Sequence, residues 1–190
     1  MKNSIYLIYF FLIVGIVACQ KQQTNVPPEM MLAEKIIKAN PDSARHLLLS
    51  LKPEIDKEDE ATQMKYGLML TKAEANCEIK CTSDSTMLKV VNYYEHHGTN
   101  NELMEAYFYL ACVYFDNEQI ASALDYYYRI VNSDSDDKST YKMRGFAYNH
   151  IGHINMYQDM YKNAMPFFKK SVSYACLAKD STNIAFFLRD

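Results

Sequence analysis

The sequence predicts an all-α protein built as an array of helical hairpins and preceded by a signal peptide. Residues 104–130 and 145–171 align to each other at a fixed offset of 41 residues. Between chain breakers, apolar residues recur at helical spacing. Self-similarity at this period is typical of stacked arrays, in which each unit buries its apolar face only against its neighbours.

A secretory signal peptide is predicted for residues 1–18. Lys2 supplies a positive charge, residues 5–14 are uninterrupted apolar sequence, and the small residue Ala18 precedes Cys19. Residues 16–19 (IVAC) resemble a bacterial lipobox. That resemblance implies cleavage before Cys19 and lipidation of Cys19, with a diacylglyceryl thioether on its sulfur and an acyl group on its new amine.

The alternative for the N-terminus is an uncleaved transmembrane anchor. As a helix, residues 5–19 would span about 22 Å of a hydrocarbon core of about 30 Å. This shortfall favours the lipoprotein interpretation.

Polar residues follow the signal peptide, and we expect residues 19–28 to form a tether that ends at Pro27-Pro28. The array is expected to occupy residues 29–190. Pro41 disfavours helix at Asn40 and separates the first two helices, the second of which Asp42 or Ser43 would cap. The expected elements are helices at 29–39 and 42–51, a loop at 52–56 around Pro53, a helix at 57–77, a helix capped by Ser83 or Asp84 that stops at Gly98, the two repeats, and a helix that opens at Ser181.

Large and small residues recur at matching positions of the two repeats. The first copy has Tyr107, Leu110, Ala111, Tyr114, Ala123 and Tyr127, and the second has Tyr148, Ile151, Gly152, Asn155, Ala164 and Phe168. These spacings resemble the tetratricopeptide repeat, which implies a right-handed solenoid of helical hairpins. The chain departs from that pattern in having no Trp, in Asn155, and in an offset of 41 where the family has 34.

The tetratricopeptide resemblance also implies a ligand-binding groove on the first helix of each repeat. The corresponding positions are Glu105, Phe108, Cys112, Phe115 and Asp116 in the first repeat and Phe146, Asn149, His153, Met156 and Tyr157 in the second. The stripe mixes aromatic and polar residues without a ring of Lys and Arg, so we expect a protein or peptide partner with apolar anchors. The alternative is that part of this stripe packs against neighbouring repeats.

Composition and motifs argue against several other functions. The formal net charge is −3 and no Lys/Arg cluster occurs, so nucleic acid is not an expected partner. The chain contains no Gly-rich phosphate loop, Gly-x-Ser-x-Gly or His-Glu-x-x-His motif, so neither enzymatic activity nor a cofactor is expected. No metal site is expected, because His150 and His153 lack a carboxylate at ligand spacing and the acidic loop at 132–137 lacks the calcium-loop Gly and Glu.

The remaining cysteines allow two interpretations. Cys77 and Cys81 are close enough to form a disulfide if the segment between them leaves the helix. Cys112 and Cys176 have no evident partner, and we expect them to be small buried residues on helices.

We therefore expect a lipid-anchored interaction scaffold in the cell envelope, facing the periplasm. The alternative comes from a resemblance to exported tetratricopeptide proteins of anaerobic Gram-negative bacteria. In those, repeats precede a membrane helix and a DNA-binding domain, so this chain would be the sensory N-terminal part of a longer protein. An incomplete repeat from about residue 181 fits that alternative, with Phe186, Phe187 and Leu188 exposed unless the segment folds back as a cap.

Overall fold

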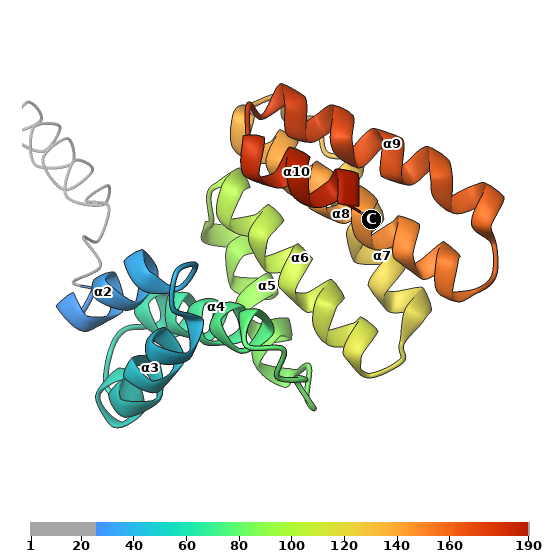
Figure 1. The fold of residues 1–190 in the computed structure, drawn as a ribbon. Helices are drawn as coiled ribbons and strands as arrows, with labels where there is room; N and C mark the ends of the chain where they lie inside the picture. The colour runs from blue at the N-terminus through green and yellow to red at the C-terminus, as the bar shows by residue number, and fades with distance from the viewer. Residues whose placement is uncertain (1–25, 190) are drawn as a thin grey trace, which may run out of the picture.

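The computed structural model describes residues 26–189, and this part of the chain is all-α with nine helices (Figure 1). The signal peptide, Cys19 and residues 19–25 of the tether lie outside the described residues. The helices are α2 (Pro28–Ile36), α3 (Pro41–Ile55), α4 (Glu60–Asn76), α5 (Ser85–His97), α6 (Asn100–Asp116), α7 (Ile120–Val131), α8 (Lys138–Tyr157), α9 (Tyr161–Leu177) and α10 (Ser181–Arg189).

Each helix packs against the next one along the chain, which gives an array of helical hairpins. In addition, α4 contacts α6 and α6 contacts α8, so alternate helices also form a continuous row. We call the surface formed by α2, α4, α6, α8 and the start of α10 the even-helix face. In Figure 1 the array runs from α2 and α3 at one end to α9 and α10 at the other.

The hairpin turns repeat one backbone conformation. Glu78, Glu118 and Asp159 follow the C-terminal ends of α4, α6 and α8, and each has a φ near +60° (57°, 60° and 59°). In all three turns the next residue's N–H bonds to a carbonyl five residues back, at 2.8–3.0 Å. Glu118 and Asp159 are separated by the same 41 residues as the sequence repeats, and Glu78 extends the recurring turn to the α4–α5 hairpin.

Two hydrophobic cores meet on α4. The first is built from α2, α3 and one side of α4, with Tyr66 and Met69 among its buried residues. The second begins at Leu68 and continues through α9. Ala123 and Ala164, the small positions of the two repeats, are buried as the stacking pattern predicts.

The N-terminal hairpin corrects two details of the sequence prediction. The expected loop at 52–56 is wrong, because α3 continues through Pro53 to Ile55. A proline in the last turn removes only one backbone hydrogen bond, and the buried side chains of Leu51 and Ile55 hold that turn against the core. Asn40, rather than Asp42 or Ser43, caps α3 by accepting the Ser43 N–H at 3.1 Å.

The other helix ends lie close to their expected positions. Helix α5 ends at His97 with Gly98 as its C-cap, and at its start the Ser83 hydroxyl accepts the Ser85 N–H at 3.3 Å. No helix in the described part of the chain is both long and apolar enough to cross a bilayer.

The last helix is not fully unpaired. Helix α10 packs on α9, and Phe187 is only 3% exposed, with its ring 5.4 Å from that of Phe146. The expectation that Phe187 is exposed is therefore wrong, while Phe186 and Leu188 do face solvent. About one residue in three or four of an α-helix faces a given neighbouring helix, and in α10 that residue is Phe187.

Candidate functional site

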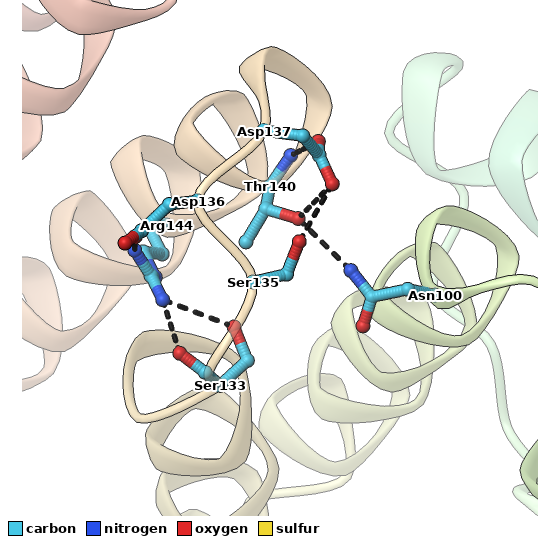
Figure 2. Close-up of polar contacts among 7 residues, drawn as sticks. All are labelled: Asn100, Ser133, Ser135, Asp136, Asp137, Thr140 and Arg144. Atoms are coloured by element: carbon cyan, nitrogen blue, oxygen red, sulfur yellow. Dashed lines mark hydrogen bonds and ion pairs between the residues drawn. The ribbon is translucent and has the colours of Figure 1, made fainter.

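A chain of polar contacts joins successive helices of the even-helix face. We call these contacts the polar ladder: Glu34–Lys65 (3.1 Å) between α2 and α4, Lys72–Glu105 between α4 and α6, Asn100–Thr140 (3.0 Å, Figure 2) between α6 and α8, and Lys142–Asp180 (3.7 Å) between α8 and the residue before α10. The contacts come from residues far apart in sequence. Each of these helix junctions therefore carries a polar contact.

A cavity of about 290 Å³ opens on this face between α2, α4 and α6. Its apolar lining residues are Ile37, Leu68, Met69 and Tyr94, and its polar lining residues are Glu34, Lys65, Lys72, Thr99, Asn101, Glu102 and Glu105. The two ladder pairs Glu34–Lys65 and Lys72–Glu105 thus lie in the cavity wall. The cavity combines an apolar surface with charges of both signs.

Burial and neighbouring charges shift the pKa values of two groups, Tyr94 and Lys142. Burial raises the pKa of Tyr94, and the nearby carboxylates of Glu102, Glu105 and Glu34 add to that rise. Burial and the neighbouring ammonium of Lys38 lower the pKa of Lys142; Lys72 adds to this effect, and Asp180 opposes it. Carboxylates therefore lie near Tyr94, and the ammonium groups of Lys38 and Lys72 lie near Lys142.

Two of the predicted groove residues are buried between helices. Phe108 is 7% exposed, and its ring lies 5.7 Å from that of Phe146 and 5.1 Å from that of His150. Asn149 is 3% exposed. The burial of both side chains fits the packing alternative, and Phe108 packs against Phe146 and His150 of α8.

Cys112 and Phe146, also predicted for the groove, are half-buried. The Cys112 sulfur lies 3.5 Å from the hydroxyl of Tyr127, and burial raises the pKa of the Cys112 thiol to about 12. At neutral pH it stays protonated, so it behaves as a packing residue rather than as a nucleophile. Phe146 lies between Phe108 and Phe187.

The remaining predicted groove residues gather near the C-terminal ends of α6 and α8. Tyr157 is 71% exposed, and its ring lies 6.2 Å from that of the half-buried Phe115. His153 and Met156 are half-buried one turn or less away, and the His153 ring meets Phe168 edge to face at 5.1 Å. This end of the stripe offers an aromatic surface that a partner can reach.

The cavity residues on α4 were not identified from the sequence. The missed signal is the turn at Glu78, which is equivalent to the turns at Glu118 and Asp159. Aligning Glu78 with Glu118 extends the repeat to α4 and places Thr71 at the small position of Ala111. It also places Leu68 and Lys72 at the positions of Phe108 and Cys112, on the ligand-facing stripe.

Within residues 26–189, no three or more His, Cys, Asp or Glu side chains group together as they would to hold a metal ion. Cys77, Cys81, Cys112 and Cys176 are free thiols in this structure, and Cys176 is exposed, so the expectation that it is buried is wrong. Comparisons with protein families, curated proteins and solved structures find no match to this chain. Functional inference therefore depends on the geometry of the even-helix face.

Proposed function

We propose that this chain is a membrane-tethered interaction scaffold of the tetratricopeptide type, a right-handed solenoid whose even-helix face binds a protein or peptide partner. The observation that carries the proposal is the row of α4, α6 and α8, which contact one another while α5, α7 and α9 complete the hairpins. Such a row gives a binding surface that grows with each repeat.

Two regions of the even-helix face suit a peptide. The cavity between α2, α4 and α6 combines apolar and charged walls. Farther along, Phe115 and Tyr157 form an accessible aromatic pair. Aromatic anchors in a partly apolar surface are typical of sites that bind peptide segments.

Binding is tested by panning a random peptide library displayed on phage against the full-length chain in detergent. We expect enriched peptides that a Phe115→Ala, Tyr157→Ala variant no longer retains. The control is Tyr128→Ala, which removes an exposed tyrosine from α7 and should leave the selection unchanged. Peptides retained equally by all three proteins, or no enrichment at all, would contradict a peptide-binding even-helix face.

The lipobox resemblance of residues 16–19 supports a scaffold that is anchored to the membrane through Cys19 and faces the periplasm. Several acyl chains hold a protein on a bilayer firmly, whereas one chain binds only marginally. Metabolic labelling with an alkyne palmitate should mark the wild type and the Cys176→Ala control but not Cys19→Ala. Label that persists on Cys19→Ala would rule out the lipoprotein interpretation.

A further inference from the structure

The cavity between α2, α4 and α6 has the size and charge pattern of a site for a small ligand with two opposite charges. We propose that it binds a short zwitterionic peptide of about two residues, with the carboxylate near Lys72 and the ammonium near Glu102. This rests on the proposed peptide-binding function and names the ligand class for one part of the even-helix face.

The volume of the cavity limits the ligand. About 290 Å³ lies just below the usual range for small-molecule sites, ~300–1,000 Å³. It corresponds to on the order of ten water molecules at ~30 Å³ each. A dipeptide fits this space, whereas a helix or a long extended segment does not.

The apolar wall is shared between the two hydrophobic cores. Ile37 and Met69 belong to the N-terminal core, and Leu68 and Tyr94 belong to the second core. An apolar side chain of the ligand would contact both cores at the point where they meet on α4. Binding should therefore stabilise the junction, since a ligand that binds only the folded state raises its stability.

The charges in the wall favour a ligand that carries both signs. Lys65 is paired with Glu34, and Lys72 with Glu105, so each lysine already has a partner on another helix. The Lys72 and Glu105 side chains are largely buried. A ligand with a single charge would leave that charge uncompensated in a partly desolvated place, whereas a zwitterion leaves the balance unchanged.

Lys72 and Glu102 line the cavity from different helices, α4 and α6. Lys72 lies on the side of Lys38 and Lys142, since the ammonium groups of Lys38 and Lys72 both lower the pKa of Lys142. Glu102 lies at the start of α6, where its carboxylate accepts the Thr99 N–H at 2.9 Å and contributes to the negative potential at Tyr94. The carboxylate of a bound dipeptide would point to Lys72 and its ammonium to Glu102.

The test is calorimetric titration of the full-length chain in detergent with four forms of the dipeptide Ala-Leu: unmodified, N-acetylated, C-amidated, and blocked at both ends. We expect the unmodified form to bind most tightly. Each block should weaken binding about tenfold, because a hydrogen bond to a charged group is lost. The doubly blocked form should bind most weakly.

Variants assign each end of the ligand. Lys72→Gln combined with Glu105→Gln removes both charges of one ladder pair, and it should bind the unmodified and C-amidated forms equally. Glu102→Gln retains a residue suited to the capping box of α6 and should bind the unmodified and N-acetylated forms equally. The matched control is Lys52→Gln, which breaks an exposed ion pair with Asp56 on α3, outside the cavity, and should leave all four affinities unchanged.

Equal binding of the four forms, or no binding by any of them, would overturn the proposal. Inorganic phosphate or acetate binding as tightly as the unmodified dipeptide would also overturn it, because the site would then select an anion alone. Circular dichroism of each variant verifies that the helices are intact. The scaffold function is tested independently of the dipeptide titrations, because the peptide selection that tests it depends on Phe115 and Tyr157.

Discussion

The side-chain amide of Asn100 donates a hydrogen bond to the hydroxyl of Thr140 across 3.0 Å, and this contact joins the first turn of α6 to the first turn of α8 (Figure 2). Thr140 is fully buried, and its hydroxyl donates in turn to the carboxylate of Asp137 at 3.1 Å. Asp137 also accepts the Thr140 N–H at 2.8 Å and the Ser135 hydroxyl at 2.7 Å. One carboxylate thus orders the start of α8, the loop before it and the contact with α6.

The other side of the same loop is held by Arg144. Its guanidinium donates to the Asp136 carboxylate at 3.1 Å and to the backbone carbonyl of Ser133, and it lies 5.6 Å from the ring centre of Tyr174. Figure 2 shows Arg144 and Asp137 on opposite sides of the loop. The loop that separates the two sequence repeats is therefore fixed from both sides.

Replacing Asp137 by Ala should lower the free energy of unfolding by about 1–2 kcal/mol, because α8 loses its N-cap acceptor. Urea denaturation followed by circular dichroism measures the change. Asp134→Ala, which removes another exposed carboxylate from the same loop, is the matched control and should change the value by less than about 0.5 kcal/mol. Equal losses in the two variants would mean that the loop charge, rather than the cap, matters.

The same carboxylate should make stability depend on pH. Hydrogen bonds from Ser139, Ser135 and the Thr140 N–H lower the pKa of Asp137. A depressed pKa in the folded state contributes stability above the unfolded pKa of about 3.9, and this contribution is lost as the pH falls toward the folded pKa. The difference in unfolding free energy between wild type and Asp137→Asn should therefore shrink in urea titrations as the pH is lowered below about 4. A difference that stays constant through this range would contradict the assignment.

Glu118→Gly should raise the free energy of unfolding by up to about 1 kcal/mol. Glu118 has a φ of 60°, a conformation that costs a residue with a Cβ about 1–2 kcal/mol and costs Gly little. Chemical denaturation measures the gain. In the control, Lys169→Gly places Gly in the interior of α9 and should lower stability by about 1 kcal/mol.

Ala123→Leu should destabilise the array by about 1–3 kcal/mol, because the added atoms enter a fully buried position between paired helices. Ala121→Leu, on the same helix but exposed, should leave the melting temperature within a few degrees. Thermal melts of both variants by circular dichroism make the comparison. If the two melts coincide, the small residues of the repeat do not set the helix spacing.

The stacking of the two repeats could be predicted from the sequence because it depends on local spacing. An offset of 41 residues places Ala123 and Ala164 at equivalent positions, and both are buried. The hairpin turns were harder to recognise, since Glu118 and Asp159 adopt a positive φ where Gly is the usual signal. The loop predicted around Pro53 was wrong for a related reason: proline usually ends helices, but Pro53 lies in the last turn of α3.

The site could be predicted only in part, for a geometric reason. A helical stripe tells which residues share a face, but it does not tell how much of that face the next helix covers. Phe108 lies on the predicted stripe and is buried against α8, whereas Tyr157 on the corresponding stripe of α8 is exposed. The cavity depends on Glu34, Lys65 and Glu102, which only the packing of three helices brings together.

Phe187→Ala should release α10 from the array. Phe187 is the buried residue of this nine-residue helix, and its ring packs against Phe146 of α8. Truncating a buried Phe costs about 3–5 kcal/mol, and a helix this short is marginal in water without its tertiary contacts. Amide hydrogen exchange in residues 181–189 should therefore speed up by about a hundredfold, while exchange in α6 stays slow.

Phe186→Ala on the exposed side of the same helix is the control and should leave exchange in α10 nearly unchanged. If the two variants exchange alike, the contact between Phe187 and Phe146 does not hold the helix in place.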